Sequence, residues 1–261
     1  MSNMLALQRC GAEDAVLRIE FSRPDHANSL TPALVAELAD AIETATDARC
    51  IVLASPGKIF CAGADIEFLA SLVGLDEKTI EVTIYDSFQR LILSIVRCPV
   101  PVVVSLQGPG VGAGADLALA CDLRVASTKA WLEESWIRIG TISALGGTVI
   151  LPAALGHADA LDLLLARKRL DADRGSATGI FQEVVEPQAL DDTVMRVANE
   201  IAALDTAAVQ AMKQLVRGGE AEVALSRALA DARRAQARLI SSPTFGKKVS
   251  DLMSRLTGQS S

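Results

Sequence analysis

Three short segments rich in apolar residues constrain the fold of this chain more than any other feature. They are CIVLAS at 50–55, PVPVVVSLQ at 99–107 and LRVA at 123–126, and such runs are typical of strands that are covered on both faces. Residues 15–21 alternate apolar and charged side chains, which predicts a half-buried strand ahead of them. Helical stretches of roughly 15 residues or more separate the strands. This order predicts βαβ units with right-handed crossovers.

Helical patterns dominate the second half of the chain. From about residue 158 onward, apolar residues recur at helical spacing over 161–165, 194–204, 205–216, 221–240 and 245–256. A further helix is expected to start at Thr31 and Pro32, a cap residue followed by proline. We therefore expect an α/β core over 1–185 and a helical region over 186–261. The long apolar stripes of the late helices fit packing on a neighbouring subunit or on the chain's own core.

Composition and charge exclude several classes of protein. The 261 residues are 50% hydrophobic, which is enough for a large core and excludes a disordered chain. The 25 basic and 32 acidic residues give a net charge of −7, and the aromatic residues are six Phe, two Trp and one Tyr. Negative charge and few rings both argue against nucleic-acid binding.

Cysteine usage and hydropathy place the chain in a compartment. Five cysteines without a CxxC pair, together with two histidines, give no zinc-site spacing, so we predict no metal and a reduced protein. The strongest apolar run, at 99–106, is far shorter than the roughly 20 residues that a membrane span needs. The first residues lack the basic and apolar regions of a secretion signal. These features predict a cytoplasmic protein with no membrane partner.

Two glycine-rich stretches, each following a buried strand, are the strongest candidates for a site. They are KIFCAGADI at 58–66 and QGPGVGAGAD at 107–116. Glycines at 108, 110, 112 and 114 allow close backbone approach and present N–H groups at a helix start, as an oxyanion or phosphate requires. They also fit tight helix–strand packing without a ligand. Residues 110–115 further match the dinucleotide pattern G-x-G-x-x-A, although the helix is short and the next strand ends without an acidic residue.

The two stretches together carry a more specific resemblance. FCAGADI at 60–66 resembles the F-(S/C)-A-G-A-D-(I/L) signature of the enoyl-CoA hydratase/isomerase, or crotonase, superfamily. The similarity runs in order through nearly the whole chain, in RPDHANSL at 23–30, CDLRVA at 121–126, RIGT at 138–141, GGT at 146–148 and SPTF at 242–245. It implies an α/β fold with a crotonase-like ββα spiral core and a C-terminal helical region. It also implies a homotrimer or a dimer of trimers.

The resemblance implies an acyl-CoA thioester as ligand, with coenzyme A as part of the substrate and no separate cofactor. The family holds the thioester carbonyl with two backbone N–H groups, which match Ala62 and Ala113 here. Two such donors can contribute about 3 kcal/mol each to an enolate. Arg23 occupies a position where members of the family often place a basic residue near the CoA phosphates, and it equally fits a solvated arginine in a turn. The backbone that lines the adenine and pantetheine path matches Ala64, Asp65 and Ile66.

The acidic residues of the family pattern are only partly matched in this chain. Hydratases of this family use two glutamates, and the first position matches Asp116 while the second matches Trp136. Trp136 cannot transfer protons, and we expect it to shape the acyl pocket. An additional carboxylate that some isomerases and dehalogenases carry falls on Ala144. Asp116 is therefore the one catalytic carboxylate that the resemblance carries over, although an aspartate at a helix start can also be purely structural.

Two neighbouring glutamates are alternatives for the missing acid. Glu133 and Glu134 precede Trp136 in WLEESW, and in an extended segment Glu134 would share a face with Trp136. Solvation or ion pairing is the more common fate of such residues. The resemblance implies an enoyl-CoA hydratase or double-bond isomerase that acts through a thioester enolate. The alternatives are an acyl-CoA decarboxylase, a C–C hydrolase and a catalytically weak acyl-CoA-binding subunit.

Overall fold

A six-stranded, mostly parallel sheet forms the centre of the protein. The structure is a computed structural model that describes residues 4–45 and 47–256. The strand order is β1-β2-β3-β4-β6-β9, in which β1 and β2 are antiparallel and the other neighbours are parallel. The strands are β1 (Leu5–Cys10), β2 (Val16–Phe21), β3 (Cys50–Ala54), β4 (Val102–Leu106), β6 (Leu123–Ser127) and β9 (Glu183–Val185). The four apolar or alternating runs are thus confirmed as strands, and β3 and β4 are buried throughout.

A second, small sheet carries one wall of the site. It contains β5 (Gly110–Val111), β7 (Trp131–Glu133) and β8 (Leu170–Asp171), in that order. The sequence pattern did not predict the short strands β8 and β9 beyond residue 158. Because these strands have two or three residues each, they are too short for an apolar pattern of period two to appear.

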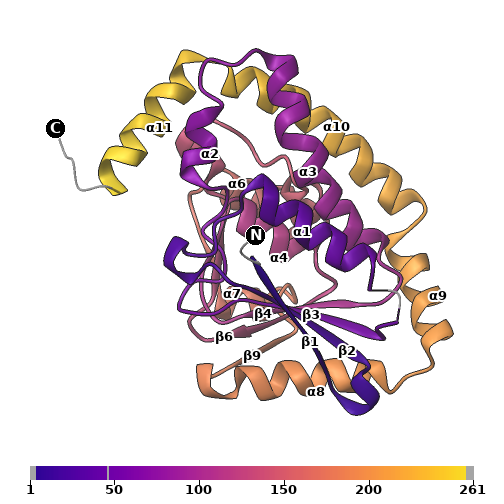
Figure 1. Ribbon diagram of the computed structural model, residues 1–261. Helices are drawn as coiled ribbons and strands as arrows, with labels where there is room; N and C mark the ends of the chain where they lie inside the picture. The colour runs from indigo at the N-terminus through magenta and orange to yellow at the C-terminus, as the bar shows by residue number, and fades with distance from the viewer. Residues whose placement is uncertain (1–3, 46, 257–261) are drawn as a thin grey trace.

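Helices cover both faces of the main sheet (Figure 1). α1 (Pro32–Glu43) begins as predicted, since Thr31 Oγ1 accepts a hydrogen bond from the Leu34 N–H at 3.2 Å. The other helices of the first two thirds are α2 (Ile66–Ser71), α3 (Glu77–Arg97), α4 (Ala113–Ala120), α5 (Gly147–Leu155), α6 (His157–Leu164) and α7 (Ala172–Ala177). Short 3₁₀ helices are η1 (Ala12–Asp14), η2 (Pro24–His26), η3 (Ser135–Ile139) and η4 (Pro187–Ala189).

The expected boundary at residue 185 falls ahead of a helix that belongs to the core. α8 (Leu190–Ala202) lies across the sheet in Figure 1, on the face opposite to α1 and α3. Its buried side chains form one apolar cluster with β2, β3, β4 and β6, through residues such as Val194 and Val52. The helices that stand apart from the sheet therefore begin after α8. Within the described residues, no helix is long and apolar enough to cross a membrane.

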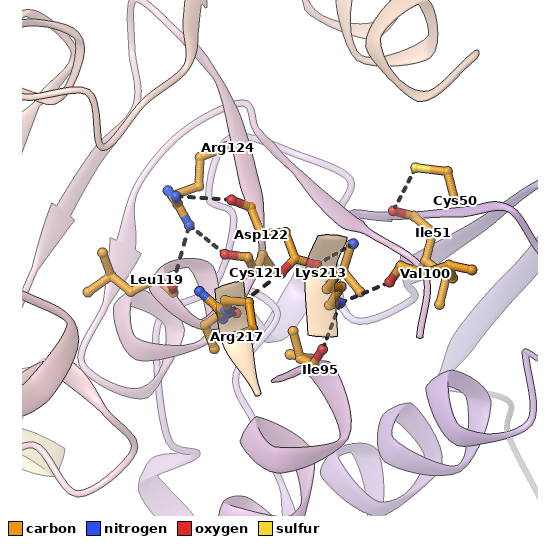
Figure 2. A network of polar contacts seen from close by, with 12 residues as sticks. Cys50, Ile51, Ile95, Val100, Leu119, Cys121, Asp122, Arg124, Lys213 and Arg217 are labelled. Atoms are coloured by element: carbon orange, nitrogen blue, oxygen red, sulfur yellow. Dashed lines mark hydrogen bonds and ion pairs between the residues drawn. The ribbon is translucent and has the colours of Figure 1, made fainter. Parts of the chain in front are cut away.

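The last three helices pack on the chain's own core. They are α9 (Thr206–Arg217), α10 (Glu220–Ile240) and α11 (Pro243–Leu256); α10 lies along α3, and α11 extends over α2 (Figure 1). A buried polar network anchors α9 (Figure 2). In it, Lys213 Nζ donates to the carbonyls of Ile95 and Val100 at 3.1 and 2.9 Å and contacts Asp122 Oδ2 at 2.6 Å. Exposed apolar residues remain on α9, including Met212, Leu215 and Val216, and the trimer stays a prediction.

Candidate active site

The first glycine-rich stretch is held in place by the turn that precedes α1. The side-chain amide of Asn28 donates to the carbonyls of Pro56 and Ile59 at 3.1 and 3.0 Å. Asn28 and Ala27 both adopt a left-handed conformation, with φ of 52° and 49°. This backbone is unusual for alanine and is kept here by the surrounding contacts. The turn therefore fixes the entry to residues 58–66.

Glycines allow the two stretches to meet at van der Waals distance. A Cβ on Gly108 would lie 1.9 Å from the Lys58 carbonyl oxygen, and one on Gly114 would lie 2.4 Å from that of Cys61. A Cβ on Gly63, where φ is +96°, would lie 2.6 Å from the Val111 oxygen. These glycines are required by close packing. The same packing brings the backbone of residue 63 next to that of residue 113.

One of the two expected N–H donors is engaged elsewhere. The Ala62 N–H donates to the Ala27 carbonyl at 3.0 Å, so Ala62 as an oxyanion donor is wrong in this structure. Ala64 pairs with Leu30 in a parallel bridge whose hydrogen bonds use the groups of Gly63 and Asp65 instead. Among the backbone hydrogen bonds of the described residues, none uses the N–H of Ala64 or of Ala113, the first residue of α4. Both groups are therefore available as donors.

A cavity of about 710 Å³ opens over these donors. Its volume lies within the range of small-molecule sites. Ala62, Gly63, Ala64, Gly112 and Ala113 form its floor, and Trp136 lines it with a side chain that is 8% exposed. Helix α11 supplies another wall, with the cations Lys248 and Arg255 and the apolar Leu252. The helical region thus completes the site within one chain.

Three of the four residues expected along the CoA path line the cavity, and the fourth does not. Ala64, Asp65 and Ile66 all line the cavity. Asp65 also caps α2, because its Oδ1 accepts from the N–H groups of Glu67 and Phe68 at 3.1 and 3.3 Å. Arg23 is not part of the cavity wall: its guanidinium faces Asp65 Oδ2 at 3.4 Å and donates to the Ser29 carbonyl at 3.2 Å. A phosphate contact for Arg23 stays a prediction.

Asp116 lies beneath the cavity floor in the first turn of α4. It is fully buried and accepts three hydrogen bonds, from Ser143 Oγ (2.8 Å), the Gly147 N–H (2.8 Å) and Trp136 Nε1 (3.0 Å). Burial raises the pKa of Asp116 to about 6, against these three donors, which lower it. Trp136 lines the cavity and donates to this carboxylate, which is not itself part of the cavity wall. Asp116 is thus close to the site and shielded from it.

The two neighbouring glutamates have opposite environments. Glu133 forms ion pairs with Arg138 at 2.9 Å and Arg169 at 2.5 Å, as the more common fate predicts. Glu134 is neither solvated nor ion-paired within the described residues. Its side chain is buried, and both carboxyl oxygens lack a partner at hydrogen-bond geometry. The extended strand ends at Glu133 and a 3₁₀ turn begins at Ser135. Glu134 nevertheless faces Asp116 rather than solvent.

Several residues of the site escaped the sequence reasoning. Ser143 and Gly147 hold the Asp116 carboxylate, and two buried glutamines hold the loop before them: Gln89 donates to the Ala144 carbonyl at 3.1 Å and Gln236 to that of Ile142 at 2.8 Å. Gly147 follows Gly146 directly, a pair that signals close approach at a helix start. The glutamines lie in α3 and α10, far from any motif. Within residues 4–45 and 47–256, no group of three His, Cys, Asp or Glu side chains is arranged to hold a metal ion.

The fold is that of an α/β enzyme class in which a cavity lies beside two glycine-rich loops and the start of a helix. The family model described as enoyl-CoA hydratase/isomerase matches residues 11–255, and the chain belongs to this family. It is an enoyl-CoA hydratase/isomerase-like enzyme that acts on acyl-CoA. The dinucleotide interpretation of residues 110–115 is therefore wrong.

Characterised relatives and solved structures agree with this assignment. The (E)-benzylidenesuccinyl-CoA hydratase of Thauera aromatica is 33% identical over 203 residues, which cover 76% of this chain and 77% of that one. The 1,2-epoxyphenylacetyl-CoA isomerase of Escherichia coli strain K12 is 28% identical over 80% of both chains. The crystal structure of an enoyl-CoA hydratase/isomerase from Pseudoalteromonas atlantica T6c superposes with a TM-score of 0.85 at 27% identity, covering 97% of this chain and 98% of that one.

Proposed function

We propose that the protein catalyses hydration or double-bond isomerisation of an enoyl-CoA through a thioester enolate. The observation that carries this proposal is the pair of uncommitted N–H groups, at Ala64 and Ala113, on the floor of the cavity. Two preorganised donors stabilise the negative charge that develops on the thioester oxygen. The start of α4 adds a favourable helix dipole at the same point. Asp116, one turn further along α4, is the proton-transfer group.

The acyl group fits an aromatic or otherwise flat shape. Trp136 and Ile139 line the cavity near the donors, with Leu69 and Leu252 on the surrounding walls. Both relatives described above are named for CoA thioesters that carry a phenyl or phenyl-derived ring. The cations Lys248 and Arg255 on α11 suit the phosphates of CoA.

Proline at position 113 tests the oxyanion hole. Ala113 is the first residue of α4, a position that tolerates proline, so Ala113→Pro removes the N–H while the helix is kept. We expect kcat/KM to fall by about 100- to 1,000-fold on whichever substrate a screen of enoyl-, cinnamoyl-, malonyl- and aryl-CoA identifies. The matched control is Glu77→Pro, at the first position of the exposed start of α3.

Three outcomes of this experiment have distinct meanings. A folded Ala113→Pro protein with normal turnover would overturn the oxyanion assignment. Wild-type binding of acyl-CoA without turnover of any thioester would instead favour an acyl-CoA-binding subunit, since Trp136 shields Asp116 in this conformation. Loss of carboxylate or cleavage of a C–C bond in the screen would favour the decarboxylase or hydrolase alternative.

A further inference from the structure

Glu134 is a buried acid that the reaction described above does not use. Its side chain is 3% exposed, and neither carboxyl oxygen has a hydrogen-bond partner within the described residues. An ionised carboxylate in such a place loses its hydration without compensation, which is costly. Burial and the nearby Asp116 carboxylate raise the pKa of Glu134 well above its ordinary value, against a smaller lowering by the Trp136 indole. The neutral acid is therefore its stable form.

The carboxyl groups of Glu134 and Asp116 both lie beside Gly147. The position that a Cβ on Gly147 would occupy lies 2.7 Å from Asp116 Oδ1 and 2.9 Å from Glu134 Oε1. The absence of a side chain at Gly147 is what lets both carboxyl groups fit there. Residues of α5, Gly147–Leu155, carry no titratable side chain. Glu133 is directed to Arg138 and Arg169, so Asp116 is the titratable group that faces Glu134.

The two acids have unequal surroundings, and this divides the protons between them. Asp116 has three donors directed at its oxygens, which favour the ionised form. Neither oxygen of Glu134 has a partner at hydrogen-bond geometry within the described residues, and the Trp136 indole near it favours the ionised form less than burial and Asp116 oppose it. When two interacting carboxyl groups differ in this way, the one with donors ionises first and its charge keeps the other protonated.

We propose that Asp116 and Glu134 form a carboxyl pair that holds a single proton at neutral pH. Glu134 then supplies the second acid, because Trp136 stands where the family pattern has the second glutamate. This inference rests on the proposed function and adds a residue to it. Asp116 takes a proton from a substrate carbon, and the electron pair of that C–H bond passes to the thioester oxygen as an enolate. The pair, now holding two protons, returns one to a second carbon of the same substrate. Protons and charge balance without an oxidant or reductant.

The pH profile of Glu134→Gln tests this role. In the wild type, kcat/KM should rise with the ionisation of Asp116 and fall when the pair loses its last proton, which gives a bell shape. Glutamine mimics the neutral acid in shape but cannot release a proton. We expect Glu134→Gln to lower kcat by about 100-fold and to remove the alkaline limb, with the acid limb preserved. Glu133→Gln is the matched control and should retain both limbs.

Infrared spectroscopy supplies a readout that needs no turnover. At pH 7 the carbonyl stretch of a protonated carboxylic acid should be present in the wild type and in Glu133→Gln, and absent in Glu134→Gln. Persistence of this band in Glu134→Gln, or an alkaline limb that remains in that variant, would overturn the pair. If no acyl-CoA is turned over, the proposed function fails, while the infrared band still decides whether Glu134 holds the proton.

Discussion

Replacing Trp136 by phenylalanine should shift the ionisation of Asp116 upward. The indole Nε1–H donates to Asp116 Oδ2 at 3.0 Å, inside a fully buried site. Phenylalanine keeps an aromatic wall and removes this donor. A hydrogen bond to a charged group contributes about 1.5–3 kcal/mol, and about 1.4 kcal/mol corresponds to one pKa unit. Burial raises the pKa of Asp116 to about 6. Loss of the indole donor should raise this pKa further, by about one to two pH units.

Activity should fall at neutral pH, because the ionised carboxylate of Asp116 is the form that acts as the base. Raising the pKa of Asp116 leaves less carboxylate at pH 7, so Trp136→Phe should lose about 2- to 10-fold in kcat/KM there, and the loss should shrink as the pH rises. The assay is the acid limb of kcat/KM in both proteins. Trp131→Phe is the matched control, because Trp131 stacks on the Arg169 guanidinium and does not contact Asp116. An acid limb that stays in place, or moves to lower pH, would refute the reasoning.

Two further substitutions test the packing around the site. Gly147→Ala places a Cβ 2.7 to 2.9 Å from Asp116, Ser143 and Glu134, so we expect at least a tenfold loss of activity and about 1–3 kcal/mol of unfolding free energy in a urea titration; wild-type activity would contradict the crowding. Lys213→Met removes the shorter of the two ion pairs of the half-buried Asp122 carboxylate, which keeps Arg217 at 3.6 Å, and leaves the Ile95 and Val100 carbonyls without this donor; it should cost about 1–3 kcal/mol, read as a lower Tm, whereas the exposed Lys247→Met should change little. A Tm for Lys213→Met equal to that of the wild type would show that the network in Figure 2 does not anchor α9.

The strands and the two glycine-rich loops could be predicted from local sequence, whereas the surroundings of the acidic residues could not. Buried parallel strands such as β3 and β4 are visible as apolar runs because every side chain along them is covered. The family resemblance locates residues 58–66 and 107–116 for a similar reason, since Gly108 and Gly114 cannot be replaced without a backbone clash. Which N–H remains free depends on the turn at Ala27, whose carbonyl accepts from Ala62. That long-range contact is invisible in a motif.

The surroundings of the two glutamates show the same limit. Glu133 and Glu134 are adjacent, and alternation along an extended strand would have separated them by face alone. In the structure the strand ends between them, and the partners of each come from residues 138 and 169 on one side and from α4 and α5 on the other. The boundary at residue 185 stays a prediction: α8, just beyond it, packs on the main sheet although it carries the same amphipathic pattern as the later helices. The pattern does not say which apolar surface a helix covers.

The most direct test of the account is the state of a bound thioester carbonyl. A non-reactive acyl-CoA labelled with ¹³C at the thioester carbon should show a downfield carbonyl shift on binding to the wild type, because the N–H groups of Ala64 and Ala113 polarise the C=O bond. In Ala113→Pro the bound ligand should resemble free acyl-CoA. An unshifted carbonyl in the wild type, or the same shift in both proteins, would contradict the oxyanion hole and the function built on it.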